Sequence, residues 1–319
     1  MGENAQKIGK KLEIMGCNIL ELFKWKEKMK DKEIKCRRQG HRNVDGKKKI
    51  THGVDLYLEY DDPYMDKKQG VFVECKNRQW KNIDKTKIEQ WIQEQINLIE
   101  CAANDASLME FYSGDSVRDC ALILINTNDG NFKKDKFYEY LSNVQVASKR
   151  IPLKIFIAGN DVIDKWNSIN TINQRDFQGS LAVIYPSMGN SRSQISNTWS
   201  ISHLFSKYIF CEAKKLVEEV DGGDKITREK RILVVFCCDI ITADSINYLW
   251  SMCRFYQYET SYKEFVFYFY PHSSYDVDYI QENFMNILRA YKTKIEPQIL
   301  NNISYKFIRN SDLPVVNNM

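Results

Sequence analysis

Two apolar runs joined by a polar turn constrain the fold of this chain more than any other feature. Residues 52–60 read His-Gly-Val-Asp-Leu-Tyr-Leu-Glu-Tyr, and residues 70–77 read Gly-Val-Phe-Val-Glu-Cys-Lys-Asn. Gly, Asp, Pro or Asn bound each run, which predicts two β-strands. Because side chains alternate across a strand, Glu74 and Lys76 share one face of the second strand, while Asp55 stands near the start of the first.

Two acids and a lysine placed in this way can hold a divalent metal ion against a phosphate group. Carboxylates supply the hard oxygen ligands that such ions prefer, and the lysine brings an ammonium group beside the attacking water. The residues therefore predict an enzyme that acts on a phosphate-containing substrate, with Asp55, Glu74 and Lys76 as its catalytic residues.

The Glu-x-Lys pattern is short, and it occurs three times, at Glu33–Lys35, Glu74–Lys76 and Glu212–Lys214. Only the middle copy lies in a strongly apolar run with an acid at the head of the preceding strand. We expect the first copy in a charge-rich stretch and the third in a helix. A charged pair in an apolar strand costs desolvation unless it is used or paired. The competing interpretation is an edge strand with a wet polar face.

Composition indicates an ordinary soluble protein of 319 residues with one or two domains. It contains no run of 18 or more apolar residues, and residues 1–11 lack the apolar segment of a secretory signal, so we expect a cytoplasmic protein without a membrane span. The nine cysteines form no Cys-x-x-Cys pair and are expected to be reduced. With four histidines, a structural zinc site is not expected: Cys36 and His41 are close in sequence but lack a matching second pair.

Positive charge is concentrated just before the first apolar run. Residues 24–50 hold 12 Lys and Arg against 4 Asp and Glu, whereas the whole chain has a net charge of +4. A basic stretch beside a metal-binding hairpin favours a polyanionic substrate. The candidate nucleic-acid-binding residues are Lys47, Lys48, Lys49, Arg37 and Arg38. Taken alone, such a run is more often a solvated helix end and loop.

Periodicity in the first half predicts helices and strands in alternation. An amphipathic helix is expected over 3–24, a weak strand over 33–38, and a helix over 84–103 with Asp84 as its N-cap. A buried strand is expected over 120–125, a helix over 134–147 and a strand over 153–158. This order predicts an α/β layer structure.

The second half is expected to form another α/β unit with a largely parallel sheet, after a linker or connection at 161–180. The domains are therefore 1–160, which is nuclease-like, and 181–319, whose role in regulation, sensing or assembly the residues do not define. Aromatic residues at 255–270 are expected to pack in the core and not to stack on bases. The expected strands are 181–185, 231–238, 264–270 and 303–309, and the expected helices are 201–220, 243–258 and 276–292.

Residues 3–158 resemble the PD-(D/E)xK nucleases, the restriction-endonuclease-like superfamily. The matching elements are a first helix with Glu13, the strand with Asp55, the Glu74-Cys75-Lys76 strand and an amphipathic helix after it. The likeness is strongest to the Mrr-type and Holliday-junction-resolvase-type branch and to nuclease subunits of bacterial phage-defence systems. Val54 stands where the family name has proline, a position that varies among such enzymes. The implied fold is a mixed sheet flanked by helices.

The resemblance also implies roles for individual residues. Asp55, Glu74 and the backbone carbonyl of Cys75 would bind Mg²⁺, for which Mn²⁺ can substitute, and Lys76 would assist the attacking water. Glu13 matches a first-helix acid that relatives direct at the metal, although a solvated glutamate explains it equally well. A glutamine from the following helix would support the site. Gln95 is favoured because it interrupts an apolar face, with Gln93 and Gln90 as alternatives. His52 could approach phosphate or could satisfy a turn.

The function predicted from these features is a Mg²⁺-dependent phosphodiesterase that cleaves DNA, as an endonuclease rather than an exonuclease, in prokaryotic anti-phage defence. A protein partner or homo-oligomer is expected. The alternative is a non-catalytic nucleic-acid-binding or partner-docking subunit that keeps the nuclease fold. Retention of Asp55, Glu74 and Lys76 argues against that alternative.

Overall fold

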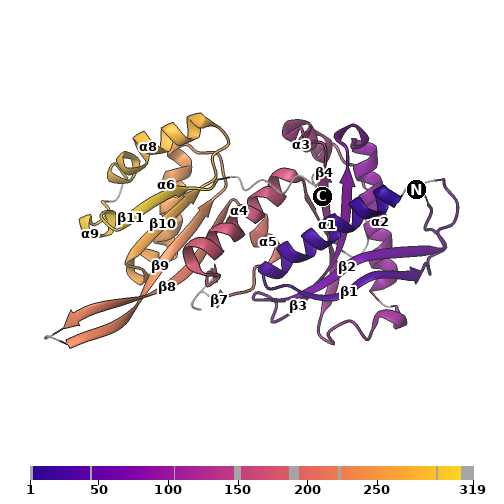
Figure 1. Cartoon of the computed structure of the whole chain (residues 1–319), viewed down its shortest axis with the longest axis horizontal. Coiled ribbons are helices and arrows are strands. Elements are labelled where there is room, and N and C mark those ends of the chain that lie inside the picture. Colours follow the sequence, from indigo (N-terminus) through magenta and orange to yellow (C-terminus); the bar gives the residue numbers. More distant parts are fainter. Residues whose placement is uncertain are drawn as a thin grey trace. The chain divides into compact units, whose positions relative to one another are not determined.

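The computed structural model describes most of the chain and divides it into two compact units, whose boundary lies between Trp166 and Asn167 (Figure 1). Residues 310–319, at the end of the expected second domain, lie outside the described residues, as do residues 147 and 292 at the ends of two expected helices. The structure describes residues 3–43, 45–103, 105–146, 152–186, 194–221, 224–291 and 294–309.

The first unit is built on a five-stranded mixed sheet with the order β1-β2-β3-β4-β5. The β1–β2 and β2–β3 pairs are antiparallel, whereas β3–β4 and β4–β5 are parallel. The sheet thus has the mixed character expected of a restriction-endonuclease-like core. Its strands are β1 (Lys26–Lys35), β2 (Thr51–Asp62), β3 (Lys67–Arg78), β4 (Val117–Thr127) and β5 (Lys154–Ala158).

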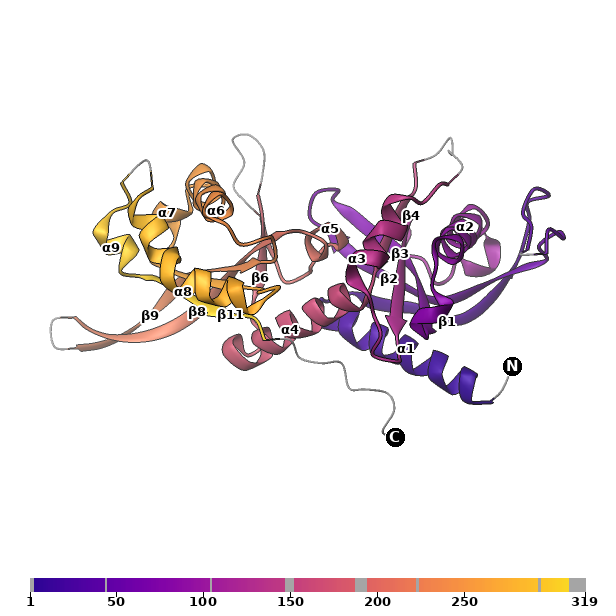
Figure 2. The same ribbon diagram turned by 90° about the horizontal axis from the view of Figure 1, so that it is seen from above.

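Helices cover both faces of this sheet. Helix α1 (Glu3–Leu22) lies on one face, and α2 (Lys85–Ala102) and α3 (Lys134–Ser142) lie on the other (Figure 2). Asp84 caps α2 as expected, since its carboxylate accepts a hydrogen bond of 2.8 Å from the backbone N–H of Lys87. The apolar face of α2 packs on β4, with Ile88 and Ile123 both fully buried. Two short 3₁₀ helices flank α2, η1 (Trp80–Asn82) and η2 (Ala106–Leu108).

The first strand begins earlier than expected. The predicted strand at 33–38 is instead β1, which starts at Lys26 and ends at Lys35. Only Met29 and Ile34 of this strand are fully buried, while most of its charged side chains are exposed. Charged residues on an edge strand protect it from pairing with other chains. They also hide the period-2 pattern by which a strand is usually found.

The polar tract expected as a linker at 161–180 is a helix, α4 (Asn160–Phe177). Its buried apolar residues recur every third position, at Ile163, Trp166, Ile169 and Ile172. Asparagines between them lower the helix propensity and dilute the apolar pattern, so composition misled the prediction. The division into two units falls within this helix.

The second unit has a six-stranded sheet with the order β11-β10-β9-β8-β6-β7. Only β9, β10 and β11 run parallel, and the other three pairings are antiparallel, so the expectation of a largely parallel sheet was wrong. Helices α6 and α8 bury their apolar residues against β9 and β10. The elements are β6 (Ala182–Tyr185), β7 (Gln194–Ser196), α5 (Ile201–Leu204), β8 (Tyr208–Asp221), β9 (Asp224–Cys237), α6 (Ala243–Phe255), α7 (Tyr258–Ser261), β10 (Glu264–Phe269), α8 (Ser274–Arg289), α9 (Pro297–Leu300) and β11 (Ile303–Phe307).

The largest error in the second unit concerns the helix expected over 201–220. Only Ile201–Leu204 is helical, and Tyr208–Asp221 forms β8, which pairs along its whole length with β9. Residues 208–211 are buried or half-buried on both faces, so their burial has no strand-like alternation. A continuous apolar run of this kind fits a buried strand or a buried helix equally well.

Aromatic residues of β10 are in the core, as expected, whereas Phe255, for which packing in the core was also expected, is 80% exposed. Phe265, Phe267 and Phe269 are at most 2% exposed, and Phe267 and Phe269 contact the ring of Phe284 on α8. Within the described residues, none of the helices combines the length and apolar character that a membrane span requires.

Candidate active site

The two predicted strands separate from each other at Asp55. Their antiparallel ladder runs from Asp62–Lys67 to Leu56–Val73, where it stops. One residue further, the Asp55 carboxylate accepts a hydrogen bond of 3.1 Å from the backbone N–H of Cys75. The Asp55 carboxylate thus takes the place of a backbone hydrogen bond between the two strands. It lies against the backbone of β3, the strand that carries Glu74.

Glu74 and Lys76 point from β3 towards α2, and each oxygen of Glu74 has a donor. The Lys76 ammonium group donates to Oε1, and Nε2 of Gln95 donates to Oε2 at 2.7 Å. Of the three candidate glutamines, Gln95 is therefore the one at the carboxylate. Gln93 bonds to Asn97 at 2.9 Å, and Gln90 bonds to Glu94 at 3.0 Å.

Burial dominates the electrostatics of the two acids. It raises the pKa of Asp55, although the Cys75 N–H and the Lys76 charge oppose the shift. It also raises the pKa of Glu74, which Lys76 lowers and the neighbouring Asp55 raises further. Ionising two buried carboxylates beside each other costs free energy. A bound cation would offset that cost, so the pair is a candidate cation site.

Lys76 remains an ammonium group in this environment. Burial alone would lower the pKa of Lys76, but the carboxylates of Glu74, Glu94 and Asp55 outweigh burial and raise it. The charged nitrogen lies 5.9 Å from the centre of the Trp91 ring. The lysine is thus held in its protonated form by the same acids that would bind a metal.

Glu13 reaches the same part of β3 from the opposite face. Its helix crosses β3 at Gly16, where an added Cβ would lie 2.7 Å from Leu124 Cδ1 and 3.6 Å from Cys75 Sγ. The pKa of Cys75 is raised by burial and then by the charges of Asp55, Glu74 and Glu13. All three predicted acids therefore surround position 75.

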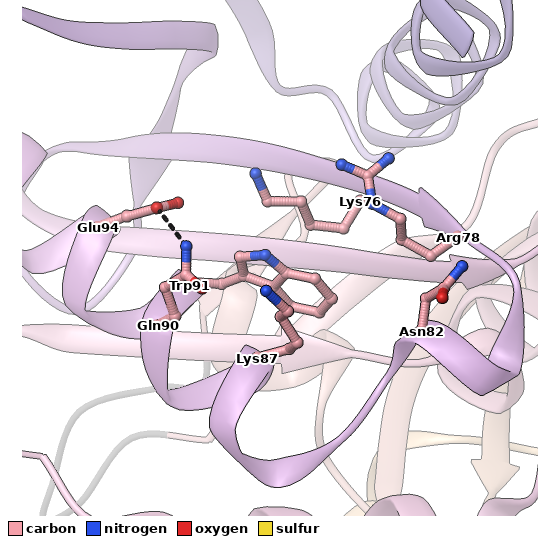
Figure 3. Close-up of a pocket in the computed structure, with 7 residues that line it drawn as sticks. All are labelled: Lys76, Arg78, Asn82, Lys87, Gln90, Trp91 and Glu94. Carbon is pink, nitrogen blue, oxygen red and sulfur yellow. Dashed lines mark hydrogen bonds between the residues drawn. The ribbon is translucent and has the colours of Figure 1, made fainter. Parts of the chain in front are cut away.

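An open pocket of about 440 Å³ adjoins Lys76. Figure 3 shows Lys76 and Arg78 on the strand facing side chains from α2, with Asn82 at one end. The residues that line the pocket are Lys76, Arg78, Asn82, Lys87, Gln90, Trp91 and Glu94. Three cations and an indole ring suit a ligand that carries both negative charge and a planar group.

Several of these residues were not predicted from the sequence. Arg78 follows Lys76 by two positions on β3, so the alternation that paired Glu74 with Lys76 also predicts its face. Lys87, Trp91 and Glu94 recur at spacings of four and three along α2, which places them on one side of the helix.

Asp31 is a further acid at the site, and it was not predicted from the sequence. The pairs Lys30–Leu56 and Lys32–Val54 place Asp31 opposite Asp55 in the β1–β2 ladder. Its charge contributes to raising the pKa of Asp55. Asp31 has a φ of 50°, a left-handed conformation that aspartate tolerates better than most residues.

The five predicted nucleic-acid-binding residues lie on the connection between β1 and β2. Arg37, Arg38, Lys47 and Lys48 are exposed and Lys49 is half-buried, and none of the five is among the described residues that line the pocket. Arg37 forms an ion pair of 3.3 Å with Asp105. Their role in binding substrate stays a prediction.

His52 does not serve as a solvent-facing group at the strand entry. It is 1% exposed, and its Nε2 lies 3.4 Å from Nδ1 of His41. The suggestion that it approaches phosphate was therefore wrong.

All three Glu-x-Lys copies lie on strands, contrary to expectation for the third. Glu212 is on β8, where its carboxylate accepts hydrogen bonds from Arg231 Nε at 2.7 Å and Tyr262 Oη at 2.9 Å. Glu33 is exposed on β1. What distinguishes Glu74 is therefore the second buried carboxylate beside it.

Comparison with known proteins agrees with this geometry. A family model described as "GAPS4 protein PD-(D/E)XK nuclease domain" matches residues 1–162, just over half of the chain. Searches of the curated proteins and of the solved structures gave no significant match. The match includes α1, the β2–β3 hairpin and α2, which carry Glu13, Asp55, Glu74, Lys76 and Gln95. The chain therefore belongs to the family of the GAPS4 protein PD-(D/E)XK nuclease domain, a branch of the PD-(D/E)XK nucleases.

Proposed function

We propose that this protein is a Mg²⁺-dependent nuclease that hydrolyses phosphodiester bonds of DNA, with Mn²⁺ as a possible substitute. The observation that carries the proposal is the convergence of Asp55, Glu74 and Lys76 at one point of β3, beside an open cationic pocket. Membership of the nuclease family supports it.

The residues present fit a hard divalent cation. Asp55 and Glu74 offer carboxylate oxygens whose ionisation burial disfavours, and Cys75, which directly follows Glu74 and donates its N–H to Asp55, supplies a backbone carbonyl. Oε1 of Gln95 is buried and has no hydrogen-bond partner, although Nε2 of the same amide is bonded to Glu74. This oxygen could accept a hydrogen bond from a water molecule bound to the metal. When bound, Mg²⁺ would polarise the phosphoryl oxygen and lower the pKa of a bound water.

Lys76 has the charge and position to stabilise negative charge that develops on the phosphate. Its ammonium group is bonded to Glu74 and is held protonated by three carboxylates. A cation bound by Glu74 and Asp55 would neutralise part of their negative charge. These carboxylates would then stabilise the ammonium form of Lys76 less, and the pKa of Lys76 would fall. As an ammonium group the lysine would stabilise negative charge on the phosphate, and after losing a proton to solvent the neutral amine could accept one from the attacking water.

The pocket beside Lys76 would receive the substrate backbone. Arg78 and Lys87 are positioned to pair with phosphates, and Trp91 offers an indole ring for a sugar or base (Figure 3). Preference for DNA over RNA, and for internal cleavage over cleavage at ends, rests on the family resemblance alone.

We further propose that the protein acts in the cytoplasm in prokaryotic anti-phage defence, with its second unit serving regulation, sensing or assembly. All nine cysteines, each within the described part of the chain, are free thiols, which is consistent with a reducing compartment. A protein partner or a second copy of the chain is expected to join it.

Cleavage of three substrates by the purified full-length protein tests the proposal. Covalently closed circular DNA, linear duplex DNA and single-stranded RNA would each be incubated with Mg²⁺, with Mn²⁺ and without added metal. The proposal expects nicking of the circular DNA that depends on metal. Cleavage of RNA alone would contradict the substrate, and cleavage of linear but not circular DNA would contradict the internal mode of cutting.

A further inference from the structure

Four potential metal ligands meet at the end of the first sheet, away from the residues assigned to the nuclease site. Cys36 follows β1, His41 lies in the connection to β2, His52 is on β2, and Cys101 is in the last turn of α2. Their ligand atoms all lie within 4.8 Å of one another, and three of the four residues are buried.

Nδ1 of His41 is at the centre of this cluster. It lies 3.4 Å from Cys36 Sγ, 3.6 Å from Cys101 Sγ and 3.4 Å from His52 Nε2. A ring nitrogen carries one hydrogen or one lone pair, so at most one of these three contacts can be an ordinary two-centre hydrogen bond. Hydrogen bonding therefore does not explain why all four groups converge.

The surroundings orient the ligand atoms inwards. Nε2 of His41 lies 2.9 Å from Oε2 of Glu100, and this bond assigns the imidazole proton to Nε2 and leaves the lone pair of Nδ1 facing the cluster. A metal-bound histidine commonly donates its other ring N–H to a carboxylate, which fixes the tautomer and the orientation of the ring.

We propose that Cys36, His41, His52 and Cys101 form a structural zinc site. A tetrahedral zinc ion, with Zn–S of about 2.3 Å and Zn–N of about 2.0 Å, separates neighbouring sulfur and nitrogen ligands by about 3.5 Å. The two contacts between His41 and the sulfurs agree with this spacing. Two thiolates and two imidazoles around one centre favour zinc over magnesium. Since His41 touches both sulfurs, the site fits one ion and not a two-iron cluster.

A zinc site was not expected from the sequence because His52 and Cys101, the second pair of ligands, are distant in the chain from Cys36 and His41. Cys36 and His41 were seen as an isolated pair, but His52 is on the next strand and Cys101 is 49 residues beyond it. The ion would tie the connection between β1 and β2 to the end of α2. It would thereby fix β2, three residues before Asp55, against the helix that carries Gln95.

Metal content of the purified full-length protein tests the site without reference to cleavage. After expression with zinc and dialysis without chelator, mass spectrometry of the elements should give about one zinc per chain. Cys101→Ser and His41→Ala should each lower the bound zinc at least tenfold. Cys238→Ser, at a half-buried cysteine of the second unit, is the matched control and should keep full zinc, as should Asp55→Asn at the nuclease site.

Cobalt substitution tests the site in wild-type protein, so its result does not depend on whether the variants fold. Wild-type protein reconstituted with Co²⁺ should develop thiolate-to-metal charge-transfer bands and the visible bands of a tetrahedral S₂N₂ centre. Zinc content below one-tenth of an equivalent in wild-type protein, with no such spectrum, would overturn the proposal. Recovery of a peptide disulfide between Cys36 and Cys101 from protein kept without reductant would also overturn it, because both sulfurs would then be unavailable as thiolates.

Discussion

Nε2 of Gln95 donates a hydrogen bond of 2.7 Å to Oε2 of Glu74, so an amide from α2 holds a carboxylate on β3. The same carboxylate receives the Lys76 ammonium group on its other oxygen. Gln95 is 2% exposed, and its amide cannot turn far without losing the bond in a buried site. The glutamine therefore sets the orientation in which Glu74 is presented to a metal.

Replacing Gln95 with leucine should weaken metal binding by roughly 10–100-fold, because outer partners of metal ligands commonly contribute that much. Isothermal titration with Mg²⁺ and Mn²⁺ measures the change. Gln93→Leu is the matched control, because Gln93 lies on the same helix and bonds to Asn97 instead. Equal affinities in the two variants would show that Gln95 serves only the packing of α2.

Replacing Lys76 with methionine should separate metal binding from cleavage. Loss of the ammonium group should lower the rate with saturating substrate and metal by ~10²–10⁴, the usual range for a general base or an electrostatic group at the transition state. Mg²⁺ affinity should be retained at a pH at which Glu74 is ionised, since the variant removes a cation that competes for Glu74. Parallel loss of affinity and rate would reassign Lys76 to the structure of the site.

Asp55 should make metal-free stability depend on pH in a defined direction. Its pKa is raised in the folded protein, so its contribution to stability is fully present below the unfolded pKa of about 4 and is lost as pH rises through the folded value. Asp55→Asn keeps an acceptor for the Cys75 N–H but does not titrate. The free energy of unfolding of this variant minus that of wild type should therefore increase from pH 4 upwards.

Urea unfolding in metal-free buffer at several pH values measures that difference. Added Mg²⁺ should stabilise wild type more strongly at the higher pH values and leave Asp55→Asn nearly unchanged. A difference that stays constant, or that decreases with pH, would mean that Asp55 is not destabilised by burial.

Binding of duplex DNA can distinguish the basic connection from the pocket. In an Asp55→Asn background, which prevents cleavage, neutralising Lys47, Lys48 and Lys49 should reduce the steepness of log K against log salt by roughly 2–3, at about 0.9 per phosphate contact. Arg78→Gln with Lys87→Gln should lower it by about 2 for the same reason. An unchanged slope in the triple variant would identify the connection as a solvated surface.

Local features of the sequence predicted which side chains converge on β3, and the structure brings them together. The β2–β3 hairpin, the Asp84 cap and the face shared by Glu74 and Lys76 follow from strand alternation and helix capping within short segments. Gln95 was found because a polar residue on the apolar face of a helix requires a partner. These are properties that neighbouring residues determine among themselves.

Features that depend on distant parts of the chain could not be predicted in this way. Strand β8 was taken for a helix because its burial comes from pairing with β9, and α4 was taken for a linker because its polar residues mask a buried stripe. The pocket joins Arg78 on β3 to Lys87 and Trp91 on α2. The cysteine and histidine cluster joins residues 36 and 101, whose proximity only the folded sheet creates.

Asp55 is proposed to belong to a metal-dependent nuclease site, and a cleavage experiment with a matched control tests this role. Wild type, Asp55→Asn and Glu33→Gln would be compared on closed circular DNA with Mg²⁺, at equal concentration of folded protein. Glu33 is the matched control, an exposed glutamate in another Glu-x-Lys copy on a neighbouring strand.

Wild type and Glu33→Gln should cleave at the same rate, and Asp55→Asn should be slower by roughly 10³-fold or more, because a catalytic metal supplies several kcal/mol of transition-state stabilisation. Equal cleavage by wild type and Asp55→Asn, or cleavage by wild type that persists in full without a divalent ion, would show that Asp55 does not serve a metal-dependent nuclease site.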